Sequence, residues 1–198
     1  MMNLPNIISL SRIPLLFVIL ALFHYKFQFS NSLALIVYVF ASFTDWLDGF
    51  CARKFNSVSS SGKLLDALTD KIFVLGLFII LLQNKMIPAW MVVLILLVVC
   101  REFLIVGLRM VAVNKQKVLA AERSGKLKTI FQMTSIGILI FHVVILKDFG
   151  MASNHWFSKF AYDLGLAIFI ISILLTIYSG LGYIVKYGYL LKEEHIAK

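Results

Sequence analysis

Four carboxylates gather in one short stretch of the chain, residues 45–70. The stretch reads DWLDGFCARKFNSVSSSGKLLDALTD, and its acids are Asp45, Asp48, Asp66 and Asp70. The first two are three residues apart and the last two are four apart, so each pair would share one face of a helix. Crowded carboxylates repel one another unless a cation lies between them, and an all-oxygen set suits Mg²⁺ or Mn²⁺. The spacing therefore predicts a carboxylate cage for divalent metal ions.

A simpler explanation is that these four acids are solvated charges in a polar loop between two helices. The whole chain has only 10 Asp and Glu residues in 198. Because four of them fall in this one stretch, the metal cage is favoured over the loop.

The segments that must position these acids are apolar. Hydrophobic residues make up 61% of the chain and charged residues 15%, and the mean hydropathy is +0.92. Crossing a bilayer as a helix takes about 20 apolar residues. We therefore expect an all-α integral membrane protein of one domain, 1–198, with a short interfacial helix over residues 1–12. Six transmembrane helices are predicted at about 7–22, 32–50, 62–82, 89–113, 129–146 and 162–185.

The distribution of lysine and arginine predicts the orientation. Arg12, the 53–71 and 109–128 stretches and the C-terminal tail fall on one side of the predicted membrane segments. Lys26, Lys85, Lys147 and Lys159 fall on the other side. Basic residues favour the cytoplasmic side, so both termini and the carboxylates should face the cytoplasm of a bacterial-type inner membrane. The net charge of +9 then reflects these loops, and no nucleic-acid partner is expected.

The spacing of the acid-rich stretch resembles a known signature. Written as Asp45-x₂-Asp48-Gly49-x₂-Ala52-Arg53-x₈-Gly62-x₃-Asp66-x₃-Asp70, it is similar at all eight positions to that of the CDP-alcohol phosphotransferases. The resemblance implies a membrane enzyme that moves a phosphatidyl group from CDP-diacylglycerol to an alcohol and releases CMP. It also implies two Mg²⁺ or Mn²⁺ ions and a homodimer. The implied roles are metal ligation by Asp45, Asp48, Asp66 and Asp70, base catalysis by Asp70, and CDP binding by Gly49, Ala52, Arg53 and Gly62.

Two details qualify this resemblance. Gly49 and Ala52 are equally consistent with a tight crossing of two helices, where small residues let the backbones approach. The family often opens with Asn-x-Pro-Asn followed by Thr-x-x-Arg, and this chain has Arg12 but a serine, Ser9, where the threonine usually stands.

A second polar cluster follows the fourth predicted segment. Its members are Arg109, Lys126, Lys128, Thr129 and Gln132. Converging bases suit a phosphate on the acceptor, whereas the alternative is an ordinary basic cytoplasmic loop. The segments REFLIVGLRM and GKLKTIFQM resemble those of the phosphatidylglycerophosphate synthases, the branch of the family whose acceptor is sn-glycerol 3-phosphate. Inositol phosphate, phosphatidylglycerol and serine stay open as alternative acceptors.

Arg101 and Glu102 are neighbours within the fourth predicted segment. Adjacent residues on a helix point in different directions, so each is expected to need its own partner. Charged residues at such a depth are functional candidates.

A divalent-cation transporter could use the same four carboxylates. Such a protein needs polar residues along several membrane segments to form a path. Here the predicted cage is confined to one end of two segments, which argues against transport.

Overall fold

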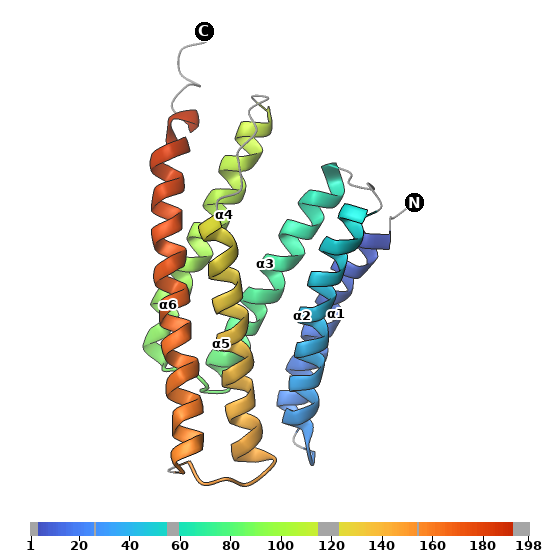
Figure 1. Cartoon of the computed structure of the whole chain (residues 1–198), viewed down its shortest axis with the longest axis vertical. Coiled ribbons are helices and arrows are strands. Elements are labelled where there is room, and N and C mark those ends of the chain that lie inside the picture. Colours follow the sequence, from blue (N-terminus) through green and yellow to red (C-terminus); the bar gives the residue numbers. More distant parts are fainter. Residues whose placement is uncertain (1–3, 26, 55–59, 115–122, 154, 192–198) are drawn as a thin grey trace. The chain divides into compact units, whose positions relative to one another are not determined.

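The computed structural model describes residues 4–25, 27–54, 60–114, 123–153 and 155–191. Within these ranges the side chains of 4–6, 8, 45–54, 60–67, 113–114, 123–126 and 190–191 lie outside the description. The described part is helical and contains no strand (Figure 1). Its helices are α1 (Leu4–His24), α2 (Ser30–Lys54), α3 (Ser60–Gln83), η1 (Ala89–Met91), α4 (Val92–Asn114), α5 (Arg123–Lys147), α6 (Trp156–Tyr187) and η2 (Gly188–Leu191).

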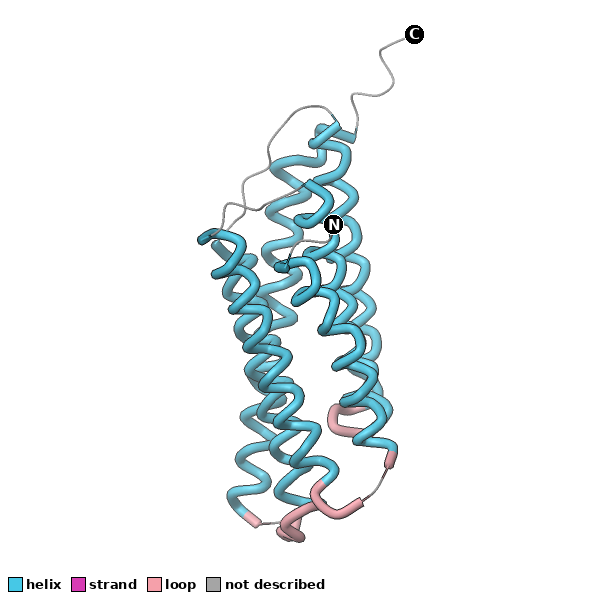
Figure 2. The backbone as a smooth tube through the Cα atoms, turned by 90° about the vertical axis from the view of Figure 1, so that its right-hand side faces the viewer, coloured by secondary structure: helices cyan, strands magenta, loops and turns pink. Residues whose placement is uncertain are grey.

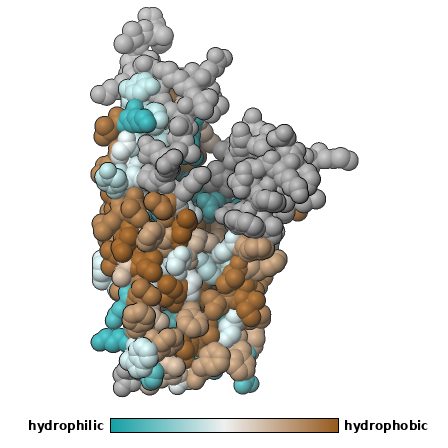
Figure 3. Space-filling model, in the orientation of Figure 1, coloured by the Kyte–Doolittle hydropathy of each residue, from teal (hydrophilic) through white to brown (hydrophobic). Residues whose placement is uncertain are grey.

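The all-α prediction is confirmed, and each predicted membrane segment lies on one of the long helices or, at 89–91, on η1. Among the described residues, Ala89–Ala112, Leu127–Lys147 and Trp156–Tyr187 are long and apolar enough to cross a membrane. Ser9–His24 and Ser30–Thr44 are shorter apolar helices. Apolar side chains cover much of the sides of the described helices (Figure 3). Six transmembrane helices therefore stay a prediction, and three are supported by length and composition.

The N-terminal expectation needs a correction. Residues 4–24 form one continuous helix, α1, so the described residues contain no separate short interfacial helix over 1–12. The only helix-breaking residue inside α1 is Pro14. A proline removes one backbone hydrogen bond, but membrane helices tolerate it, and the apolar sequence continues on both sides of it.

The chain divides into two compact units. Unit 1 comprises residues 1–88 and 133–166, and unit 2 comprises residues 89–132 and 167–198. Helices α5 and α6 each contribute a segment to both units. The prediction of a single domain stays a prediction.

Unit 1 is built around the packing of α1 on α2 and α3. Buried side chains of α1 and α3 include Ile19, Phe73 and Phe78. Gly76 of α3 lies directly beneath the Leu16 side chain of α1, and a Cβ at this position would collide with it. At this position α3 leaves room for the Leu16 side chain because glycine has no Cβ.

The described turns of unit 1 lie at one end of its helices. Figure 2 shows the described parts of the α1–α2, α3–α4 and α5–α6 connections at the same end. The last turns of α2, which carry Asp45 and Asp48, and the first turns of α3, which carry Asp66 and Asp70, lie toward the opposite end (Figure 1). The backbone thus puts the two acid pairs at the same end of their helices.

The turn after α5 caps the start of α2. Asp148 accepts three hydrogen bonds of 2.6 Å, from the side-chain amide of Asn31 and from both the backbone N–H and the hydroxyl of Ser32. A carboxylate at a helix N-terminus satisfies free N–H groups and complements the helix dipole. Partial burial raises the pKa of Asp148, but the hydrogen bonds from Asn31 and Ser32 outweigh it, so the pKa lies below its ordinary value.

Replacing this cap should destabilise the protein at neutral pH. Asp148→Ala leaves the Asn31 and Ser32 donors without their acceptor, and we expect a loss of about 1 kcal/mol of unfolding free energy. The measurement is thermal unfolding in detergent. The control is Asp163→Ala, because Asp163 is an exposed carboxylate on α6. Equal losses for the two variants would contradict the cap.

The effect should also depend on pH. Because the folded-state pKa of Asp148 is lowered, its contribution is complete above the unfolded-state pKa of about 4. The contribution is lost as the pH falls through the folded value. The difference in melting temperature between wild type and Asp148→Ala should therefore shrink on acidification. A difference that grows toward acid pH would contradict the assignment.

Candidate functional site

One of the four predicted carboxylates, Asp70, has a described side chain, and it pairs with a buried arginine. Arg12 of α1 is 1% exposed, and its Nη1 lies 3.6 Å from Oδ1 of Asp70 on α3, whose side chain is 35% exposed. A buried guanidinium requires a counter-charge. The pair therefore restrains Asp70 while part of its carboxylate stays accessible.

The role of Arg12 was not predicted from the sequence. The sequence marked it only as part of an opening pattern and as a basic residue on the predicted cytoplasmic side, because its partner is far away along the chain. The packing of α1 on α3 is what brings the two residues together.

The remaining residues of the acid-rich motif are placed by their backbone alone. Asp45, Asp48, Gly49, Ala52 and Arg53 lie in the C-terminal turns of α2, and Gly62 and Asp66 lie in the first turns of α3. Their side chains are outside the described residues, and so is that of Lys126 in α5. Among the described side chains no group of three metal-binding residues occurs. The carboxylate cage therefore stays a prediction.

Unit 2 contains a buried group of three charges. Glu102 of α4 accepts a hydrogen bond of 2.8 Å from Nη1 of Arg101 and another from Nζ of Lys128 on α5. Arg101 also donates through Nη2 to the hydroxyl of Ser179 on α6, at 2.6 Å. Glu102 and Lys128 are 9% and 7% exposed. The three charges thus link α4, α5 and α6 within unit 2, and together they carry one net positive charge.

The expectation that Arg101 and Glu102 have separate partners was wrong for one contact, because Arg101 bonds directly to Glu102. The reason is the glycine at position 180. A Cβ there would lie 2.5 Å from Cγ of Arg101, so the arginine side chain can lie across α6 only because glycine leaves the room. In the described part of the chain, the buried Nε of Arg101 has no hydrogen-bond partner.

Two of the predicted acceptor residues have buried protein partners. Lys128 contacts Glu102, and Nε2 of Gln132 donates to the hydroxyl of Thr176 at 3.3 Å. Gln132 and Thr176 are 4% and 0% exposed. Thr129, also predicted for this site, is half-buried in α5. The contacts of Lys128 and Gln132 therefore hold the start of α5 within unit 2.

Arg109 differs from these residues because its side chain is exposed. Its Nε donates to the hydroxyl of Tyr183 on α6 at 3.4 Å, and its guanidinium carbon lies 5.8 Å from the centroid of that ring. Within the described residues its two terminal amino groups make no hydrogen bond. Arg109 therefore presents a planar pair of donors that matches a phosphate or carboxylate.

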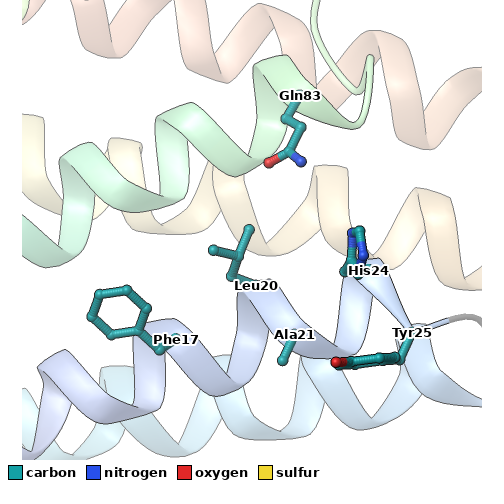
Figure 4. A pocket seen from close by; sticks show the side chains of 6 residues that line it. All are labelled: Phe17, Leu20, Ala21, His24, Tyr25 and Gln83. Carbon is teal, nitrogen blue, oxygen red and sulfur yellow. The ribbon is translucent and has the colours of Figure 1, made fainter.

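A hollow in unit 1 lies far from the acids along the helices. It has a volume of about 280 Å³ and is lined by Phe17, Leu20, Ala21, His24, Tyr25 and Gln83 (Figure 4). His24 and Gln83 are the last residues of α1 and α3, at the end where the turns lie. The hollow is therefore separate from the predicted cage.

Comparison with known proteins adds to this geometry. A sequence model described as CDP-alcohol phosphatidyltransferase matches residues 2–183. The chain belongs to the CDP-alcohol phosphatidyltransferase family. The match includes the acid-rich motif, α4 and most of α6, so this CDP-alcohol phosphatidyltransferase carries the family sequence over nearly its whole length.

Several curated relatives share the name CDP-diacylglycerol–glycerol-3-phosphate 3-phosphatidyltransferase. The phosphatidyltransferase described here is 38% identical to the protein from Bacillus subtilis (strain 168) over an alignment of 154 residues that covers 72% of this chain and 78% of the relative. It is 38% identical to that from Rickettsia typhi over 140 residues, 71% and 77% of the two chains. It is 27% identical to the protein from Salmonella typhimurium over 184 residues, which cover 92% of this chain and 93% of the relative.

The buried charges of unit 2 predict a large effect of neutralising Glu102. Glu102→Gln in the phosphatidyltransferase leaves Arg101 and Lys128 without their shared anion, and breaking a buried ion pair costs roughly 3–5 kcal/mol. We expect a marked fall in the unfolding temperature measured in detergent.

The matched control removes one cation together with the anion. Glu102→Gln combined with Lys128→Met should recover part of the lost stability, because one uncompensated charge is gone. Lys128→Met is also measured alone. If its destabilisation simply adds to that of Glu102→Gln in the double variant, the two residues are not coupled and the pairing is contradicted.

Proposed function

We propose that this protein transfers the phosphatidyl group of CDP-diacylglycerol to sn-glycerol 3-phosphate, giving phosphatidylglycerophosphate and CMP. The observation that carries the proposal is its similarity to the Bacillus subtilis relative of that name over 72% of the chain. Family membership over residues 2–183 supports the same class of reaction.

The donor set fits divalent metals. The four acids of the motif lie at the same end of α2 and α3, and all supply carboxylate oxygen, the ligand that Mg²⁺ and Mn²⁺ prefer. Asp70, the member with a described side chain, keeps part of its carboxylate exposed. The residues that would hold two ions are Asp45, Asp48, Asp66 and Asp70. When bound, such ions neutralise the diphosphate and make its phosphorus more electrophilic.

Asp70 has a further role in this proposal. It would accept the proton of the acceptor hydroxyl while the new O–P bond forms and the phosphoanhydride bond to CMP breaks. Arg12 would hold the Asp70 carboxylate in place through their contact. Gly49, Ala52 and Gly62 would leave room for the nucleotide, and Arg53 would pair with the diphosphate.

The acceptor would bind through its phosphate. The proposed site comprises Arg109, Lys126, Lys128, Thr129 and Gln132. Arg109 supports this assignment best, because its terminal amino groups are exposed and make no hydrogen bond within the described residues. The net positive charge of the Arg101, Glu102 and Lys128 group in the same unit would favour an anionic acceptor over a neutral one.

The proposed setting is a bacterial cytoplasmic membrane. Six transmembrane helices would put both termini and the site at the cytoplasmic face, where nucleotide and metal ions are available. CDP-diacylglycerol would enter sideways from the bilayer, and sn-glycerol 3-phosphate from the cytoplasm. We also propose a homodimer, as the family resemblance implies.

The reaction is tested with purified protein in detergent containing Mg²⁺ and CDP-diacylglycerol. We expect CMP release with sn-glycerol 3-phosphate, and not with inositol phosphate, serine or phosphatidylglycerol. Release with another of these acceptors would keep the transferase chemistry and overturn the acceptor. Absence of release with all four, together with metal flux into proteoliposomes, would favour the transporter.

Asp70→Asn should separate turnover from donor binding. The amide cannot take the acceptor proton, so we expect turnover to fall by at least about 100-fold. Binding of CDP-diacylglycerol should stay close to wild type, as measured by retention of the labelled donor in detergent. If donor binding is lost together with turnover, Asp70 is an essential metal ligand and the assignment as base is wrong.

Arg109→Ala should act on the acceptor alone. Losing charged hydrogen bonds to a phosphate is expected to raise the KM for sn-glycerol 3-phosphate about 10-fold or more. The KM for CDP-diacylglycerol should stay unchanged. The control is Lys186→Ala, because Lys186 is an exposed cation on α6 in the same unit. Equal effects of the two variants would indicate general electrostatics and remove Arg109 from the site.

A further inference from the structure

Tyr183 is a buried aromatic residue beside the proposed acceptor site. It is 3% exposed and packs with Ile105 and Leu108 of α4, which are themselves buried. All three residues lie in unit 2. The ring is therefore fixed by packing on one side, unlike a surface tyrosine.

A second tyrosine supports this ring. Tyr187, one turn further along α6, packs against Tyr183 in a tilted arrangement, with ring centroids 4.7 Å apart and an interplanar angle of 55°. Aromatic pairs at such centroid distances attract each other beyond the effect of their buried area. Lys186 lies over the Tyr187 ring at 5.3 Å. The two tyrosines thus form an aromatic pair near the C-terminal end of α6.

Of the three guanidinium nitrogens of Arg109, only Nε donates a hydrogen bond to this tyrosine pair. Its Nε donates to the Tyr183 hydroxyl at 3.4 Å, and its guanidinium carbon lies 5.8 Å from the ring centroid. A cation within about 6 Å of an aromatic ring is attracted to the ring face. The contact through Nε leaves both terminal amino groups for another ligand.

We propose that Tyr183 is a positioning residue that orients Arg109 to bind the phosphate of the acceptor. The inference rests on the proposed function. An arginine side chain has many rotamers, and fixing it on binding reduces affinity. Because Tyr183 restrains the guanidinium in the free protein, less of that entropy is lost when the acceptor binds.

This role differs from that of an ordinary core residue. If Tyr183 only stabilises unit 2, removing its hydroxyl lowers stability and changes the KM values of both substrates or of neither. If it acts through Arg109, removing the hydroxyl changes acceptor affinity only while Arg109 is present. A double-mutant cycle separates the two roles.

The variants are Tyr183→Phe, Arg109→Ala and the combination. Tyr183→Phe keeps the ring and its packing and removes only the hydroxyl. We expect it to raise the KM for sn-glycerol 3-phosphate roughly 3- to 10-fold, the effect of losing one weak hydrogen bond. Both kcat and the KM for CDP-diacylglycerol should stay within about twofold. In the Arg109→Ala background, Tyr183→Phe should produce no further rise.

The matched control is Tyr187→Phe. It makes the same chemical change one turn away, and in the described part of the chain the Tyr187 hydroxyl makes no hydrogen bond. Its KM for sn-glycerol 3-phosphate should equal that of wild type. A second readout is competitive inhibition by inorganic phosphate, whose inhibition constant should rise in parallel with the acceptor KM in Tyr183→Phe. If Tyr183→Phe is poorly folded, Tyr183→Met keeps a flexible apolar side chain in the core without the phenolic oxygen.

The outcomes of these measurements distinguish a failure of the positioning role of Tyr183 from a failure of the proposed function. In one outcome, Arg109→Ala raises the acceptor KM, but Tyr183→Phe changes that KM equally with and without Arg109. The positioning role is then overturned, whereas the acceptor site stands. If Arg109→Ala leaves the acceptor KM unchanged, the acceptor site itself is wrong. If no acceptor supports CMP release, the proposed function fails before the cycle is measured.

Discussion

The constraint on which the structure depends is that a charge buried among apolar helices needs a counter-charge. Removing an ion from water costs several kcal/mol even after the protein relaxes. Arg12, 1% exposed, meets this requirement through Asp70, and Lys128 and Arg101 meet it through Glu102. The Arg12–Asp70 and Lys128–Glu102 pairs each join two helices. Arg101 and Glu102 are both on α4, but Arg101 also bonds to Ser179 on α6. The buried charges therefore determine which helix faces can meet.

This constraint also sorts the charged residues by function. A cation with a buried partner is held by that partner, and much of its charge is already compensated. Lys128 belongs to this group, and its partner Glu102 is 9% exposed. Arg109 is exposed and rests on a tyrosine, which restrains the side chain but does not neutralise it. An anionic substrate would therefore meet uncompensated charge at Arg109 more than at Lys128.

Much of the architecture could be predicted from the sequence because it depends on local patterns. Apolar runs of sufficient length predict helices, and the α2 and α3 bounds bring the two acid pairs to the same end without any tertiary information. The spacing of Asp45 through Asp70 predicts metal chemistry in the same way. The expectation that was wrong is the separate short helix over residues 1–12, because α1 continues from Leu4 through Pro14 to His24. The cost of a proline in a helix depends on its context rather than on residue type alone.

The contacts that could not be predicted join residues far apart in the chain. The meeting of Arg12 and Asp70 requires α1 to pack on α3, where Gly76 lies beneath Leu16. The turn of Arg101 toward Glu102 requires the space over Gly180, and no periodicity signals that a glycine on α6 will lie beneath an arginine on α4. The partner of Arg109, Tyr183, likewise comes from the last long helix.

The cap on α2 has a consequence for depth in the membrane. A helix is stiff along its axis, and α2 has 25 residues, so it behaves as a rod roughly 37 Å long. Its first turn is tied to the α5–α6 turn by Asp148, and its last turns carry Asp45 and Asp48. Anchoring one end of a rod sets the height of the other. In the proposed topology of six transmembrane helices, the level at which the acids meet the lipid headgroups would thus be set from the opposite surface of the bilayer.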